Sequence, residues 1–253
     1  TTPLRPEARA AMVEILAEPG NPSSVHRAGR TARAAVEKAR RQIADFLGTV
    51  PETVIFTSGG TEADLLALRG SGRARVLASS IEHDAVLAAV PKVTRVPVGR
   101  DGFLDLVALE TLLAVSDEPA IVSVMWANNE TGAIQPLQDV VAIAKARGAL
   151  VHSDAVQAAG KLSIDFESSG LDLLSISSHK IGGPSGVGAL LAREGLALDP
   201  LITGGGQERG RRSGTENLSG IVGFGAAAER AAADMTASRE ETQKIGLLRD
   251  RFE

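Results

Sequence analysis

The sequence contains no cysteine and no tyrosine, and it has a single tryptophan. The absence of cysteine excludes disulfides, thiolate metal sites and a cysteine nucleophile within these 253 residues. Aromatic residues make up only 3% of the chain, so alanine, leucine, valine and isoleucine must pack the core. No apolar run approaches the ~18 residues of a membrane span, which indicates a water-soluble globular protein.

An excess of charge of one sign is also missing. The net charge is −4, and acidic and basic residues are interspersed, so nothing indicates a nucleic-acid or membrane partner. The first residues do not form the basic-then-apolar pattern of a secretory signal, which favours the cytoplasm. A length of 253 residues suits one large domain, or one domain with a small appendage.

Strand-like and helix-like segments alternate along the chain. Short apolar runs predict strands at residues 54–57, 75–78, 92–98, 120–126, 149–152, 171–176 and 187–192. Helical periodicity predicts helices at residues 31–47, 61–68, 84–90, 104–113, 137–147 and 218–233. This order predicts an α/β fold of three layers, in which helices cover both faces of a mostly parallel sheet.

Polar clusters follow four of the predicted strands. They occupy residues 58–61, 128–130, 154–157 and 177–180. In a parallel sheet, ligands bind beyond the carboxyl ends of the strands, where these clusters would meet. One cluster alone carries little weight, whereas four together can form a single site.

The first cluster, Ser58-Gly59-Gly60-Thr61, has the features of an anion site. Two glycines allow close approach of the backbone, and a helix begins at Thr61. Free N–H groups and the helix dipole at such a point attract phosphate. An ordinary capped helix after a glycine turn has the same features. The segment is not a P-loop, because no Gly-Lys-Ser/Thr follows.

Asp154 and Lys180 each follow a predicted buried strand. A carboxylate in the position of Asp154 needs a cation or several donors, and the protonated ring nitrogen of a cofactor would serve. His152 shares a face with Asp154, which raises the possibility of a metal, but no third ligand has matching spacing. Lys180 precedes a glycine-rich turn and suits an amine nucleophile, although a surface lysine at a strand end is the alternative.

Two further segments have ligand-binding chemistry. His83 follows the predicted strand 75–78, and its imidazole can stack on a flat ring or move protons. A lone histidine is nevertheless more often structural. Residues 204–215 contain three arginines, which can bind phosphate or carboxylate, although a solvated arginine-containing loop has the same composition.

Together these segments resemble the cysteine desulfurases, a branch of the class V aminotransferases with the fold-type I pyridoxal-phosphate architecture. The longest matches are Ser-Ser-His-Lys-x-Gly-Gly-Pro-x-Gly-Val-Gly at residues 177–188 and Gly-Gly-Gly-Gln-Glu-x-Gly-x-Arg-x-Gly-Thr at residues 204–215. Shorter matches lie at residues 57–62, 82–83, 128–132 and 154–157. The segments occur in the family's order and span nearly the whole chain.

The resemblance implies a role for each candidate residue. Lys180 forms a Schiff base with pyridoxal 5′-phosphate and moves protons, and Asp154 pairs with the protonated pyridine nitrogen. Gln157 bonds the phenolic oxygen of the ring, and His83 stacks on the ring and assists proton transfer. The other implied cofactor contacts are the phosphate-binding Gly60, Thr61, Ser177 and His179, the ring-side Asn129, and Thr215, which reaches the phosphate of a neighbouring subunit in a homodimer.

The family reaction converts L-cysteine to L-alanine and passes the sulfur to an enzyme cysteine as a persulfide, for iron–sulfur clusters or thio-cofactors. We expect residues 21–235 to form the large cofactor-binding domain and residues 1–20 to belong to a small domain. Residues 236–253 would begin the helix that leads to the rest of the small domain, where the family's cysteine and a substrate-binding arginine lie.

Since the chain has no cysteine, we expect it to be a portion of a longer desulfurase that serves a sulfur-acceptor protein. One alternative is a selenocysteine lyase or another enzyme of the class V aminotransferase type. The other is a non-catalytic partner protein with the same fold.

Overall fold

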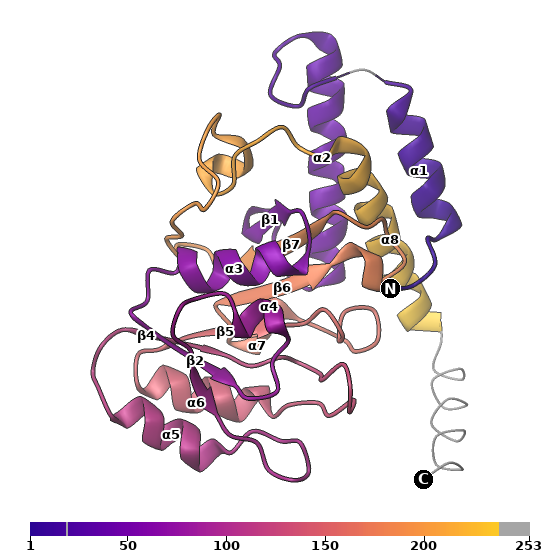
Figure 1. The fold of residues 1–253 in the computed structure, drawn as a ribbon. Coiled ribbons are helices and arrows are strands. Elements are labelled where there is room, and N and C mark those ends of the chain that lie inside the picture. Colours follow the sequence, from indigo (N-terminus) through magenta and orange to yellow (C-terminus); the bar gives the residue numbers. More distant parts are fainter. Residues whose placement is uncertain (19, 238–253) are drawn as a thin grey trace.

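A computed structural model describes residues 1–18 and 20–237 of the chain (Figure 1). Seven strands form one sheet in the order β1-β7-β6-β5-β4-β2-β3. Their bounds are Val54–Thr57 (β1), Arg75–Ser79 (β2), Thr94–Val96 (β3), Ala120–Ser123 (β4), Leu150–Asp154 (β5), Leu173–Ser177 (β6) and Gly188–Ala192 (β7). Only β7 pairs antiparallel with its neighbours β1 and β6, so the predicted mostly parallel sheet is confirmed.

Helices cover both faces of this sheet, as the three-layer prediction requires. The α-helices are Pro6–Leu16 (α1), Arg27–Phe46 (α2), Gly60–Gly70 (α3), Asp84–Leu87 (α4), Leu106–Ala114 (α5), Leu137–Ala146 (α6), Phe166–Ser169 (α7) and Leu218–Ala237 (α8). Short 3-10 turns lie at Pro51–Thr53 (η1), Ser178–Lys180 (η2) and Gln207–Gly210 (η3).

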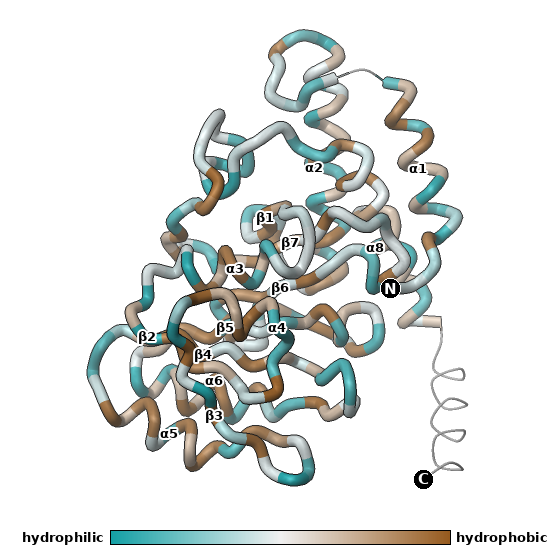
Figure 2. Tube along the Cα trace, in the orientation of Figure 1, coloured by the Kyte–Doolittle hydropathy of each residue, from teal (hydrophilic) through white to brown (hydrophobic). Residues whose placement is uncertain are grey.

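Alternation along the strands divides the core into two layers. Val54 and Phe56 belong to the core layer that also contains buried residues of α2, α5, α6 and α8, whereas Ile55 belongs to the layer that contains buried residues of α3 and α4. α1 lies against α8 on the outside (Figure 1), and hydrophobic and hydrophilic residues alternate along it (Figure 2). Within the described residues, no helix is long and apolar enough to cross a membrane.

Three predicted elements are clearly shorter in the structure. The helix predicted at residues 84–90 ends at Leu87, the strand predicted at residues 92–98 spans only Thr94–Val96, and the strand predicted at residues 120–126 ends at Ser123. The apolar run continues through the buried Met125, but its backbone N–H donates to the Glu82 carboxylate at 2.6 Å. On the β5 side, backbone hydrogen bonds continue from the Val124 N–H to the His152 carbonyl at 3.1 Å and from the Trp126 N–H to the Asp154 carbonyl at 2.8 Å. Only the pairing with β2 ends at Ser123. The expected domain boundaries stay predictions, and residues 238–253 of the last one lie outside the described part.

The carboxyl ends of β1, β2, β4, β5 and β6 lie at one edge of the sheet. The register pairs Thr57 and Ser177, the last residues of β1 and β6, with Gly188, the first residue of β7. Asp154 ends β5 and pairs with Ser175. The polar clusters that follow these strands are thereby placed together.

Candidate active site

A cavity of about 340 Å³ lies at this edge of the sheet. The segments after five strands line it, with Gly60, Thr61, Asp64, His83, Ala85, Met125, Ala127, Asn129, Asp154, Val156, Gln157, Ser177, His179 and Lys180. Every predicted cofactor-binding residue except Thr215 belongs to this set. Thr215 lies instead in a smaller recess of about 130 Å³ with Thr57 and Ser58, at the end of β1.

The beginning of α3 supplies backbone donors to the cavity. Gly60 opens the helix, and a Cβ added there would lie 3.0 Å from a methyl group of Val156. Glu62 in the first turn accepts from the Ser58 N–H at 2.7 Å and from Arg212 Nε at 2.8 Å. Burial acts to raise the pKa of Glu62, but the hydrogen bonds from Arg212 and Ser58 outweigh it and lower the pKa. The hydrogen bonds of Glu62 with Ser58 and Arg212 therefore hold the first turn of α3 in place.

Asp154 presents a buried carboxylate to the cavity. Its Oδ1 accepts from the Val156 N–H at 2.8 Å, which is its one hydrogen bond among the described residues. Burial raises its pKa, and the Val156 hydrogen bond and the positive charges of His83 and Lys180 offset part of the effect. A buried carboxylate with so few donors suits a ligand that brings a positive charge.

Asp64 was missed by the sequence reasoning. It lies on α3 four residues after Gly60, so both face the cavity, and its side chain is buried. Burial raises the pKa of Asp64 well above its ordinary value, and the charge of Asp154 raises it further. A nearby Ser175 hydroxyl lowers it in part, and Glu82 raises it. Because the positive charges of His83 and Lys180 act on Asp154, its ionised form is favoured over that of Asp64, whose pKa is raised further.

His152 lies beneath Asp64 and is fully buried. Its Nε2 is 3.6 Å from Asp64 Oδ1, yet burial lowers the pKa of His152 to about 3, so the two do not form an ion pair at neutral pH. The ring nitrogens bond instead to the hydroxyls of Ser123 at 2.8 Å and Ser175 at 2.9 Å. Across the described residues, no group of three histidine or acidic side chains could hold a metal ion.

Lys180 ends the η2 turn, and the glycine-rich segment after it folds back tightly. The Gly183 N–H donates to the Ser178 carbonyl at 3.0 Å, and a Cβ on Gly183 would lie 2.0 Å from Ser178 Oγ. The His179 carbonyl accepts from the Thr2 N–H at 2.9 Å. These contacts fix the backbone that carries Lys180 into the cavity.

His83, Gln157 and Asn129 also line the cavity. His83 caps α4, and its Nδ1 accepts from the Ala85 N–H at 3.1 Å, which orients the imidazole. Asn128 Oδ1 accepts from the Glu130 N–H at 2.9 Å and shapes the turn that carries Asn129. Gln157 follows Asp154 by three residues and also lines the cavity.

Comparison with known proteins indicates the family of the chain. The family model for aminotransferase class-V matches residues 1–251. An IscS-like cysteine desulfurase of Mycobacterium tuberculosis is 44% identical over the whole chain, which covers 68% of that protein. Among solved structures, a NifS-like protein superposes with a TM-score of 0.91 at 39% identity, over 97% of this chain and 71% of that one.

A second solved structure, SspA in complex with cysteine, superposes with a TM-score of 0.85 at 34% identity, over 90% of this chain and 70% of that chain. The chain thus spans about two thirds of the length of the curated relatives it matches. On this sequence identity and shared fold, the chain belongs to the class V aminotransferase family and, within it, to the cysteine desulfurases.

Proposed function

We propose that the cavity binds pyridoxal 5′-phosphate and that the chain carries the cofactor-binding part of an enzyme that removes sulfur from L-cysteine. The proposal rests on one observation: Asp154, a buried carboxylate, and Lys180, an amine, both line the same cavity. SspA, which shares the fold, has been solved in complex with cysteine.

The residues present fit this cofactor. Asp154 lacks a cationic hydrogen-bond partner in the described part of the chain, and a protonated pyridine nitrogen would supply one. The N–H groups of Gly60 and Thr61 at the positive end of the α3 dipole would hold the phosphate, together with Ser177 and His179. Bound pyridoxal phosphate would supply an electron sink that stabilises negative charge on a substrate carbon.

The chain's own residues would hold and move the protons of the reaction. Lys180 Nζ is the amine that lines the cavity, and it would exchange a proton with the substrate carbon. The Nδ1 of His83 accepts the Ala85 N–H, so its proton in the neutral form sits on Nε2. Burial disfavours the ionised form of Asp64 more strongly than that of Asp154, which the positive charges of His83 and Lys180 favour.

A thiol must accept the sulfur of the substrate, and no residue of this chain provides one. In the reaction a thiolate attacks the cysteine sulfur, the carbon–sulfur bond breaks, and the carbon takes up a proton to give alanine. The chain contains no cysteine, so we propose that the acceptor thiol comes from outside these 253 residues. Downstream delivery to iron–sulfur clusters or thio-cofactors through an acceptor protein, and a homodimer with Thr215 at the neighbouring phosphate, belong to the same proposal.

The test is alanine formation by the full-length protein. Loaded with pyridoxal phosphate and given L-cysteine, it should release alanine, and the Lys180→Ala variant should release none. Alanine from L-selenocysteine but not from L-cysteine would indicate a selenocysteine lyase instead. Failure to bind pyridoxal phosphate would point to a non-catalytic protein and overturn the proposal.

A further inference from the structure

The loop between β7 and α8 contains two residues in a strained conformation. Glu208 has a φ of 48° and Arg209 a φ of 58°, in the left-handed region that residues other than glycine rarely adopt. Such conformations persist only where the surrounding contacts determine them. The side chains of this loop make those contacts with the body of the protein.

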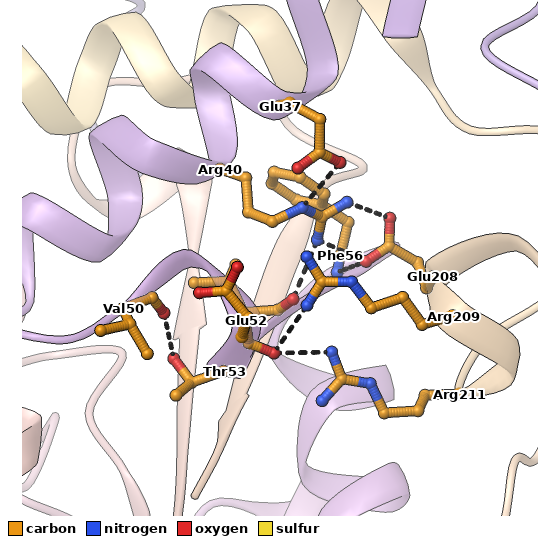
Figure 3. Close-up of polar contacts among 10 residues, drawn as sticks. Glu37, Arg40, Val50, Glu52, Thr53, Phe56, Glu208, Arg209 and Arg211 are labelled. Atoms are coloured by element: carbon orange, nitrogen blue, oxygen red, sulfur yellow. Dashed lines mark hydrogen bonds and ion pairs between the residues drawn. The ribbon is translucent and has the colours of Figure 1, made fainter. Parts of the chain in front are cut away.

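Glu208 is buried against Arg40 of α2 (Figure 3). Arg40 Nη1 donates to Glu208 Oε2 at 2.7 Å and Nη2 donates to Oε1 at 2.9 Å, so the two side chains meet in a forked pair. The Phe56 N–H donates to the same Oε2 at 3.0 Å, and the guanidinium lies 4.7 Å from the centre of the Phe56 ring. The pair therefore joins the loop to both α2 and β1.

The arginines of the loop extend this attachment in two directions. Arg209 and Arg211 donate to the Glu52 carbonyl at 3.1 Å and 2.9 Å (Figure 3). Arg212 donates to Glu62, in the first turn of α3, at 2.8 Å and 3.3 Å. The loop is thus fixed to the turn before β1 and to the helix start that lines the cavity.

A buried ion pair is a weak source of stability, because removing two charges from water costs about as much as their attraction returns. It does hold the attached backbone in one geometry, since any other arrangement would leave a charge buried without its partner. Neither Arg40 nor Glu208 lines the 340 Å³ cavity. An effect of the pair on that cavity must pass through the loop, or through β1, which Phe56 joins to the pair and which leads to Gly60.

We infer that the Arg40–Glu208 pair positions the phosphate end of the cofactor site, by fixing the loop that brings Arg212 to Glu62 and that carries Thr215. The inference rests on the proposed function, because it assigns the pair a part in holding pyridoxal phosphate. Arg40 and Glu208 are positioning residues. They leave the ring end of the site, at Asp154 and Lys180, unaffected.

The test compares two ligands that differ only in the phosphate. Dissociation constants of pyridoxal phosphate and of pyridoxal are measured for the full-length protein and for its Glu208→Gln variant. Glu208→Gln should displace the loop and raise the dissociation constant of pyridoxal phosphate by about tenfold or more. The dissociation constant of pyridoxal should stay within about twofold of the parent value. Arg40→Lys keeps the charge but loses the fork, and it should give a smaller loss of the same kind if Glu208→Gln does not fold.

Asp172→Asn is the matched control. Asp172 is also a buried carboxylate that accepts from a strand N–H, that of Val151 at 2.8 Å, and pairs with a cation, Lys145. It does not line the cavity, so its substitution should lower the melting temperature without changing the ratio of the two dissociation constants.

The outcomes separate this inference from the proposed function. A parent protein that does not bind pyridoxal phosphate would overturn both. A parent that binds it, with Glu208→Gln and Arg40→Lys variants that bind both ligands as the parent does, would overturn the positioning role alone. Equal losses for pyridoxal and pyridoxal phosphate would overturn it as well, because the effect would then not lie at the phosphate.

Discussion

Asp154 and Asp64 are buried carboxyls on the same cavity, yet replacement by asparagine should weaken cofactor binding only at Asp154. Asp154→Asn removes the anion that would pair with the pyridine nitrogen. A hydrogen bond to a charged group contributes about 1.5–3 kcal/mol. At about 1.4 kcal/mol per factor of ten, the loss corresponds to roughly 10- to 150-fold weaker binding of pyridoxal phosphate. Asp64→Asn replaces the carboxyl whose ionised form burial disfavours more strongly by a neutral amide of the same shape, so binding should change by less than about threefold.

The assay is a titration of each full-length variant with pyridoxal phosphate at pH 7.5, followed by visible absorbance. The two variants control for each other, because both remove one carboxylate from the same buried cluster. If Asp64→Asn weakens binding as much as Asp154→Asn does, the inference that Asp154 ionises more readily than Asp64 is wrong.

Asp64→Asn also has a second, independent consequence, which concerns the pH dependence of stability. Burial raises the pKa of Asp64 well above its ordinary value, so the native state keeps a proton at pH values where the unfolded state has already released it. Stability then falls as pH rises from the unfolded pKa towards the folded pKa. Asp64→Asn removes this dependence, so its stability relative to the parent should become more favourable as pH rises from 5 to 7. A difference that does not change with pH in denaturant unfolding would contradict the argument.

Two further predictions concern the layer beneath the site. Burial lowers the pKa of His152 to about 3. As pH falls below 6.5, His152 therefore binds a proton in the unfolded state but not in the native state, and the native state loses stability. His152→Gln should therefore make the melting temperature fall less steeply between pH 6.5 and pH 5, and an unchanged slope would refute this. A Cβ on Gly188 would lie 2.6 Å from the Gly59 carbonyl carbon and 2.7 Å from the Ile176 oxygen. Gly188→Ala should cost about 1–3 kcal/mol in urea unfolding, and full stability would contradict the close packing of β7.

The strands could be predicted well from the sequence because their apolar runs are short and bounded by glycine or polar residues. The run Val54–Thr57 has the predicted bounds, since Ser58 and Gly59 end it. The antiparallel direction of β7 was not predicted. Only ten residues separate Ser177 from Gly188, which is too few for the helical crossover that a parallel neighbour needs. The length of this connection alone would therefore have predicted the antiparallel direction.

The start of α2 was placed too late for a reason of local chemistry. The helix begins at Arg27, where His26 Nδ1 accepts from the Gly29 N–H at 3.2 Å. Histidine is not among the usual capping residues, so the pattern gave no signal before Thr31.

The candidate site was predictable where a polar cluster follows a strand, because strand topology gathers such clusters at one edge. Asp64 was not found, since it lies inside a helix among the buried Ala63, Leu66 and Ala67 and interrupts no pattern. The pairing of Arg40 with Glu208 joins positions 168 residues apart, and no local spacing indicates it. Both depend on the packing of one element against another.

The most direct measurement of the central claim is the identity of the lysine that binds the cofactor. The full-length protein is loaded with pyridoxal phosphate, treated with borohydride to reduce the bond between cofactor and lysine, digested, and mapped by mass spectrometry. We expect the pyridoxyl label on Lys180 and its loss in Lys180→Ala. A label on another lysine, such as the neighbouring Lys161, or a label that survives Lys180→Ala would contradict it.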